Sequence, residues 1–337
     1  MLNATSTKYL EMYCQQLAKD NEVADVSKQF NIAPPMETKL RQGILQSVGF
    51  LGMLAAMPVD QIKGQVVDVG NSGLITGRKT NDRFYAELGQ GGHTYELTET
   101  DSGVFITWEM MTQWANSGSK NEWAKLMNNA ITRNLGLDTL RIGFHGTHIA
   151  TGDTNPTTYP LGQDVNKGWL TIVKEKAPAQ VLATATLDPT GQAAGSYKNL
   201  DSLANDLENT VIHEVFQGDD ELVILVGRDL VAAEQHRLLE SADKPTEHKA
   251  AQSLAKTING RKVYTPPFFP PKSMWITTLK NLQVLTQKGT QWRKSRNEED
   301  RKRFETSYLR MEGYGVGRFE KFAAIEQVDI VDPNPAP

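Results

Sequence analysis

The stretch that decides the fold is SKNEWAKLMNNAITRNLGLDTLRIGFHG, residues 119–146. Ser119 and Glu122 have the spacing of a capping box, in which each side chain accepts a hydrogen bond from a free amide at the helix start. Apolar residues then recur at steps of three and four, as in an amphipathic helix: Trp123, Leu126, Met127, Ala130, Ile131, Leu137 and Leu140. The pattern predicts a helix of about 25 residues and about 40 Å, with a bend expected at Gly136. A helix of this length can serve as the central element against which the other helices and strands pack.

The first sixty residues are predicted to be helical pieces joined by hinges. Residues 4–20 have the period of a short amphipathic helix, and a second helix is expected to end before Pro58. The pair Pro34-Pro35 marks a break between them, because proline lacks the amide that a helix interior needs. Such pieces are more typical of an arm than of a core, so the sequence assigns residues 1–60 to an N-terminal arm.

A glycine-rich excursion follows the arm. Residues 65–69 and 95–108 are predicted strands, and residues 70–94 between them hold many glycines and few large apolar groups. A loop of that length without its own core is usually functional or disordered. The sequence therefore predicts a long two-stranded loop with a flexible tip over residues 61–109.

The second half of the chain contains a predicted α/β subdomain over about residues 190–290. Asn199 can cap an amphipathic helix, ELVILV at Glu221–Val226 is typical of a strand buried on both faces, and Arg228–Leu239 follows as a helix. Residues 183–196 are small and polar and are predicted to form a loop. Residues 308–330 contain alternating stretches that predict strands returning to the body, and residues 331–337 form a proline-rich, loose tail.

Composition excludes several classes of protein. Charged residues make up 23% and hydrophobic residues 39% of the 337 residues, which is typical of a globular protein. A net charge of −4 argues against a polycation that condenses DNA. The single cysteine, Cys14, excludes an intramolecular disulfide framework and any multi-cysteine metal site, as expected for a reducing cytoplasm. No apolar run reaches about 18 residues, so no membrane span is expected.

Candidate chemistry is sparse. His145 and His148 form the only close histidine pair, and with Asp153 they could make a zinc site, but the glutamate usual between helical histidines is missing. An ordinary loop is the favoured interpretation. The charged run Arg293–Arg303 could contact phosphate, yet its acidic members favour a solvated or intersubunit face. We therefore expect no catalytic residues, no cofactor and no metal.

The order of the parts resembles that of the shell proteins of tailed bacteriophages with the Hong Kong 97 fold. Several stretches resemble one branch, the major capsid proteins of the coliphage P-two group (peduoviruses), and the similarity is collinear from about residue 20 to residue 326. The stretches are Asp25–Phe30, Gly168–Leu170, Ala177–Val181, Glu221–Leu230, Phe269–Pro270, Met274–Thr277, Leu279–Leu282, Glu312–Tyr314 and Glu320–Lys321. The resemblance is patchy over residues 70–100 and 183–196.

The resemblance implies an α+β fold and a structural role without enzyme activity. The N-terminal arm is followed by the extended β-loop, a peripheral domain of residues 110–190 and 291–330, and an axial domain of residues 191–290. The helix at 119–146 would be the spine of the peripheral domain. Many copies would join as pentamers and hexamers into an icosahedral phage head enclosing double-stranded DNA, assembled in the host bacterial cytoplasm and retained in the virion.

The resemblance also implies partners and a processing step. The partners are further copies of the chain, a scaffolding protein and maturation protease, the portal protein and possible decoration proteins, with packaged DNA nearby and no membrane. The protease would remove residues 1–30 by cutting at or near Phe30–Asn31, which is expected to lie in an exposed hinge before the proline pair.

Two alternatives remain open from the sequence. One is a nanocompartment shell protein of the same fold, which would lack a cleaved arm and enclose an enzyme instead of DNA. The other belongs to a different class, a metal-dependent hydrolase that uses His145, His148 and Asp153.

Overall fold

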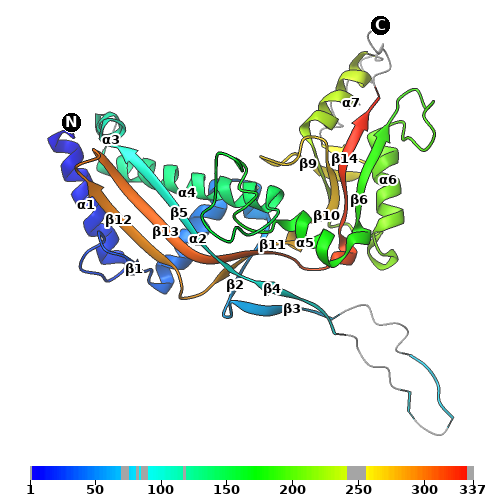
Figure 1. Ribbon diagram of the computed structural model, residues 1–337, viewed down its shortest axis with the longest axis horizontal. Coiled ribbons are helices and arrows are strands. Elements are labelled where there is room, and N and C mark those ends of the chain that lie inside the picture. The colour runs from blue at the N-terminus through cyan, green and yellow to red at the C-terminus, as the bar shows by residue number, and fades with distance from the viewer. Residues whose placement is uncertain are drawn as a thin grey trace. The chain divides into compact units, whose positions relative to one another are not determined.

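The computed structural model describes residues 2–69, 76–80, 83–84, 90–116, 119–240 and 256–331 (Figure 1). The chain divides into two compact units. Unit 1 comprises Met1–Ile62, Leu97–Gly168 and Val284–Gly313, and unit 2 comprises Lys63–Glu96, Trp169–Gln283 and Tyr314–Pro337. None of the helices in the described ranges is long and apolar enough to cross a membrane.

Unit 1 packs four helices on a sheet. The helices are α1 (Ala4–Asp20), α2 (Pro34–Ser47), α3 (Trp108–Asn116) and α4 (Lys120–His145), with a 3₁₀ turn at Leu51–Met53. The strand order is β1-β12-β13-β11-β2, and β5 pairs with β13 as well. The strands are β1 (Phe30–Asn31), β2 (Ala55–Val59), β5 (Thr98–Thr107), β11 (Leu282–Gln287), β12 (Trp292–Glu298) and β13 (Arg303–Val316).

The predicted long helix is confirmed as α4, which runs unbroken over 26 residues (Figure 1). The backbone amide of Ser119 donates to Glu122 Oε2 at 2.7 Å, as the capping pattern predicted. Gly136 allows helix α2 to pack closely against α4. A Cβ at that position would lie 2.8 Å from Ser47 Oγ and 3.0 Å from the carbonyl oxygen of Ile44. Only glycine lets the two helices come this close.

The first sixty residues differ from the prediction. Helix α2 begins at the proline pair instead of after it, because the first turn of a helix needs no amide from proline. It ends at Ser47, and Ala55–Val59 is a strand, not a helix. Helices α1 and α2 also pack into the core of unit 1, where Leu10 and Tyr13 are buried. The apolar sides of this segment are therefore covered by the same chain, with α3 and α4 supplying the contacts.

Unit 2 contains a six-stranded sheet in the order β6-β14-β10-β7-β9-β8. Its strands are β6 (Val181–Leu187), β7 (Leu222–Val226), β8 (Thr257–Ile258), β9 (Arg261–Tyr264), β10 (Met274–Thr278) and β14 (Ala323–Ile330). Its helices are α5 (Trp169–Lys176), α6 (Leu200–Val211) and α7 (Arg228–Glu240), with 3₁₀ turns at Pro178–Gln180, Glu214–Phe216, Leu279–Asn281 and Phe319–Lys321. Every residue of β7 is buried, as its apolar run predicted.

The two units divide the chain differently from the predicted domain limits. Strand β6 pairs in parallel with β14, and β14 pairs with β10, so all three lie in unit 2. Residues 183–187 are therefore a strand, not part of a loop. The predicted returning segment 308–330 contributes to two sheets, through β13 and through β14. The β6–β14 pairing joins residues 181–187 to residues 324–330, and nothing in the local pattern of β6 points to its partner.

The glycine-rich excursion begins and ends as a separate two-stranded sheet. Strand β3 (Lys63–Val69) pairs antiparallel with β4 (Gln90–Glu96), and Lys63 Nζ lies 2.7 Å from Glu96 Oε1 in an exposed ion pair. None of the hairpin's described side chains is buried. The predicted flexible tip falls mainly on residues 70–75, 81–82 and 85–89, which lie outside the described residues.

Candidate functional site

The predicted processing point lies in a paired strand. Phe30 and Asn31 form β1 and pair antiparallel with Arg293 and Trp292 of β12. The Phe30 side chain is 6% exposed and packs in an apolar cluster with residues such as Ile131. The expected hinge is therefore a paired strand in which Phe30 is buried and Asn31 is exposed, and residues 27–29 of the preceding turn are exposed as well. A protease that binds an extended substrate needs β1 to detach first, which is a local opening of the edge of the sheet.

Helix α1 packs against the aromatic side chains of Trp123 and Phe304. The Tyr13 ring meets the rings of Trp123 and Phe304 edge-on, with centroids 6.1 and 6.2 Å away. Ser6 Oγ donates to the carbonyl oxygen of Met111 at 3.4 Å, and the Tyr13 hydroxyl donates to Asn128 Oδ1 at 2.8 Å. Since Trp123 and Met111 are fully buried under α1, departure of this helix would expose a large apolar surface.

The only cysteine of the chain lies on the buried side of α1. Burial raises the pKa of the Cys14 thiol from its ordinary 9.0 to about 11, against the opposing charge of Arg293. The thiol is therefore neutral at physiological pH and is no nucleophile. Because the thiol is shielded only while α1 is docked, the reactivity of Cys14 can report whether α1 is docked.

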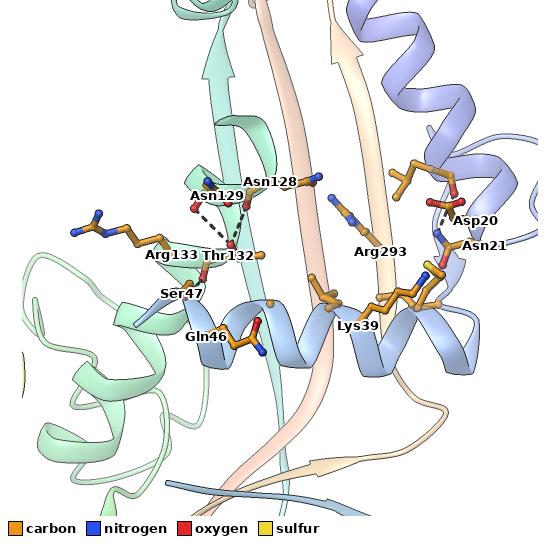
Figure 2. Close-up of a pocket in the computed structure, with 15 residues that line it drawn as sticks. Asp20, Asn21, Lys39, Gln46, Ser47, Asn128, Asn129, Thr132, Arg133 and Arg293 are labelled. Atoms are coloured by element: carbon orange, nitrogen blue, oxygen red, sulfur yellow. Dashed lines mark hydrogen bonds between the residues drawn. The ribbon is translucent and has the colours of Figure 1, made fainter. Parts of the chain in front are cut away.

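A groove of about 610 Å³ lies between the C-terminal end of α1, helix α2, helix α4 and strand β12, all in unit 1 (Figure 2). Polar side chains from all four elements line it, and in Figure 2 Arg293 projects between the α1 side and the α4 side towards Asn128. The lining residues are Leu17, Asp20, Asn21, Ile32, Met36, Lys39, Leu40, Gly43, Gln46, Ser47, Asn128, Asn129, Thr132, Arg133 and Arg293.

Arg293 is a half-buried cation without an acidic partner in the described part of the chain. Its Nη2 donates to the Tyr13 hydroxyl at 3.3 Å and its Nε to Thr306 Oγ1 at 3.4 Å, both neutral acceptors at long distances. No carboxylate of the described residues forms an ion pair with it. Guanidinium groups that lose part of their hydration are usually paired, so this arrangement can receive an anion from outside the chain.

A buried hydrogen-bond network ties α2 to the sheet beside this groove. Gln291 Nε2 donates to Glu37 Oε1 at 2.5 Å, and the Tyr308 hydroxyl donates to Gln291 Oε1 at 2.5 Å. Burial raises the pKa of Tyr308, so its hydroxyl keeps the proton that it donates. Sequence reasoning missed this network, because Glu37 and Gln291 are 254 positions apart and share no motif, and it named Arg293 only as the start of the charged run, not as part of a groove.

The histidine candidates do not form a metal cluster. His148 Nδ1 lies 2.9 Å from Thr147 Oγ1, and its ring meets the ring of Tyr159 at 5.4 Å. His145 ends α4. Among the described residues, which include Asp153, no group of three or more His, Cys, Asp and Glu side chains is placed to hold a metal ion.

The charged run 293–303 forms ion pairs on one face of the sheet. Arg296 and Arg303 contact Glu305 at 3.0 and 2.6 Å, and Arg296 contacts Glu298 at 2.9 Å. Hydrogen bonds from Arg303 and then Arg296 hold the pKa of Glu305 below its usual range. These internal pairs favour the solvated or intersubunit face over a phosphate site.

Solved structures of phage-related shells share this fold. A chain of the satellite phage P4 procapsid that includes the size determination (Sid) protein aligns with a TM-score of 0.70 and 23% identity. The alignment covers 87% of this chain and 99% of that chain. The capsid of an empty GTA particle aligns with a TM-score of 0.51 and 10% identity over 84% of this chain and 90% of that chain. At these identities the likeness shows the fold, and the predicted α+β Hong Kong 97-type capsid fold is confirmed.

Sequence comparisons give the family. The capsid protein of Escherichia phage P2 is 28% identical over 292 residues, covering 81% of this chain and 80% of the relative. The major capsid protein of Serratia phage KSP20 is 24% identical over 340 residues, covering 96% and 97%. The model of the phage major capsid protein P2 family matches residues 9–328. The chain therefore belongs to the P2 family of phage major capsid proteins, and it is a structural, non-enzymatic component of the phage head.

Proposed function

We propose that copies of this chain assemble as pentamers and hexamers into an icosahedral head that encloses double-stranded DNA. The observation that carries the proposal is the match of residues 9–328 to a family of phage major capsid proteins. In this proposal unit 1, with α4 as its spine, is the peripheral domain, and unit 2 is the axial domain. The β3–β4 hairpin is the extended loop that lies on a neighbouring copy.

Exposed apolar side chains and a hairpin without buried side chains among its described residues support self-assembly. An isolated two-stranded hairpin is only marginally stable in water, and β3–β4 has no buried side chain among its described residues. Phe105 in unit 1 and Val215 in unit 2 are 58% and 60% exposed. Contacts between copies would cover such groups, and a closed shell multiplies each weak contact many times.

The proposed partners follow from the same role. They are a scaffolding protein with a maturation protease, the portal protein and possible decoration proteins. A related procapsid is named with a size determination protein, so a partner that sets head size is a further candidate. Packaged DNA would border the shell without specific binding, because a chain of net charge −4 offers little counterion release.

Electron microscopy tests the assembly proposal. The full chain is expressed with and without its scaffolding partner, purified and examined in negative stain. We expect closed shells or regular capsomer rings in at least the first condition. A monodisperse monomer in both conditions would contradict the proposal.

We further propose that a protease removes residues 1–30 by cutting at Phe30–Asn31. The match of the preceding stretch Asp25–Phe30 to the family supports this position, and the exposed turn at residues 27–29 offers a nearby entry point. Since Phe30 is buried in β1, the cut requires opening of this edge strand. Intact-mass analysis of protein from mature heads should give a chain that begins at Asn31. A chain that begins at Met1 would rule the processing out.

A further inference from the structure

We propose that the groove between α1, α2, α4 and β12 docks an acidic, amphipathic segment of a partner protein, with Arg293 receiving one of its carboxylates. The groove is large enough, at about 610 Å³, to hold several side chains of a peptide (Figure 2). It lies wholly within unit 1 and is distinct from the hairpin and from the exposed outer face of the sheet.

The charges around the groove favour an acidic occupant. Lys39, Arg133 and Arg293 line it, against the single carboxylate of Asp20. Within the described ranges none of the three cations forms an ion pair. Arg293 is half-buried on the floor, whereas Arg133 extends outward at one end in Figure 2. A carboxylate bound to Arg293 would be partly shielded from water, where a charge-assisted, bidentate pair gains most.

The remaining lining suits a peptide. Leu17, Met36 and Leu40 give the groove an apolar side, and Ile32 is buried beneath it. The side-chain amides of Gln46 and Asn129 make no hydrogen bond to other described residues, so they are available for a peptide backbone. An occupant with apolar side chains on one face and carboxylates on the other would satisfy both sets of groups.

A nucleic acid fits the same groove less well. No aromatic side chain lines it, so bases have nothing on which to stack. The apolar side of the groove would lie against a strongly hydrated phosphate backbone. These two features favour an acidic, amphipathic peptide over a phosphate chain.

The groove has one more property, which rests on the proposed processing. Leu17, Asp20 and Asn21 belong to residues 1–30, whereas α2, α4 and Arg293 belong to the part that would remain. The cut at Phe30–Asn31 thus lies between two walls of the groove. The site is complete only in the uncut chain, and loss of α1 would weaken the hold on the docked segment.

Binding of a designed probe to the full, unassembled chain tests the docking site. The probe is a fluorescein-labelled helical peptide with leucine on one face and glutamate on the other, and its control carries glutamine for glutamate. We expect the acidic peptide to bind at least about tenfold more tightly than the control by fluorescence anisotropy, and binding to weaken with salt. Equal binding of both peptides would overturn the proposal, as would tighter binding of a single-stranded oligonucleotide.

Matched variants place the binding in the groove. Arg293→Gln is expected to lose about tenfold or more in affinity for the acidic peptide. The double variant Lys39→Gln with Arg133→Gln at the rim of the groove should also bind the acidic peptide more weakly, and it changes no residue of the folded core. Arg301→Gln, an exposed arginine outside the groove, is the control and should bind as the unaltered chain does. A double rim variant and an Arg293 variant that both bind normally would contradict the assignment.

A cut in place tests the coupling to processing. A site-specific protease sequence inserted in the exposed turn at residues 27–29 allows the folded chain to be cut there. Peptide affinity should fall after the cut fragment has been separated, and unchanged affinity would overturn the coupling. This result is independent of the mass of the head protein: absence of processing in heads leaves the groove's affinity intact, and absence of peptide binding leaves the processing proposal intact.

Discussion

Helix α1 and the β3–β4 hairpin are both predicted to leave the body of the chain, and the structure treats them in opposite ways. Helix α1 buries Leu10 and Tyr13 among aromatic side chains of α3, α4 and β13. The hairpin buries none of its described side chains. The difference is one of side-chain pattern: an apolar stripe at helical spacing can dock on its own chain, whereas a glycine-rich ribbon offers too little apolar area and depends on a neighbour.

The largest expected effect on stability is at Trp123, the buried tryptophan against which α1 packs. Trp123→Ala removes a fully buried indole that contacts Tyr9 and Tyr13 on α1. The cavity should lower the free energy of unfolding by about 3–5 kcal/mol, measured by urea denaturation of the unassembled chain. Trp292→Ala, at a tryptophan that is 40% exposed, is the control and should cost below about 1 kcal/mol. Equal losses in the two variants would contradict the docking of α1.

A smaller loss in the free energy of unfolding is expected where α2 packs against α4. Helix α2 follows the proposed cleavage point and would remain in the processed chain. Gly136→Ala places a methyl group 2.8 Å from Ser47 Oγ, and the forced separation should cost about 1–3 kcal/mol in the same urea assay. Gly43→Ala on the facing helix is the matched control. Its Cβ would lie 3.7 Å from Thr132 Cγ2, an ordinary contact, so it should be neutral or stabilise by about 0.5–1 kcal/mol. If Gly136→Ala were also neutral, the helices would not be in close contact.

The docking of α1 should also depend on pH. Because burial raises the pKa of Cys14 from 9.0 to about 11, the unfolded chain loses this proton first as pH rises. Stability linked to Cys14 is therefore complete below pH 9.0 and falls between pH 9.0 and about 11. The Cys14→Ala variant should lack this part of the decline, measured as the difference in urea midpoints across that window. A parallel decline in both proteins would show that the thiol is not buried, and alkylation of Cys14 with a half-maximal rate near pH 9.0 would show the same.

The smallest effect on stability is expected in the hairpin. Val66→Asp in β3 changes a side chain that is only half-buried and belongs to a two-stranded sheet, so the unassembled chain should unfold within about 0.5 kcal/mol of the unaltered chain. Assembly into shells, measured by negative-stain microscopy, should fall sharply if this ribbon lies on a neighbour. Lys63→Gln, which removes one partner of an exposed ion pair, is the control and should assemble normally. Normal assembly of Val66→Asp would remove the proposed role of the hairpin.

The parts of the fold that the sequence predicted correctly are those whose signal is local. Helix α4 follows from a capping box and an apolar stripe within 28 residues, and β7 from five consecutive apolar residues. Strand β6 was missed because small and polar residues at an exposed edge carry no strand pattern, and its pairing with β14 arises only in the folded chain. The processing point was placed by resemblance, yet its burial in β1 depends on β12, which follows it by about 260 residues.

The sequence by itself determined the long helix, the buried strand and, through an ordered series of resembling stretches, the capsid family. It also gave the first strand of the β3–β4 hairpin, but the predicted second strand at residues 95–108 is mostly β5, which pairs with β13. Periodicity and family likeness both depend only on the order of residues along the chain, so they can be recognised without knowledge of the tertiary contacts. Only the tertiary structure decided that α1 is docked, that Phe30 is buried and that Arg293 faces a groove without a carboxylate partner among the described residues. Each of these depends on contacts between residues more than a hundred positions apart, which burial and packing select and no local pattern encodes.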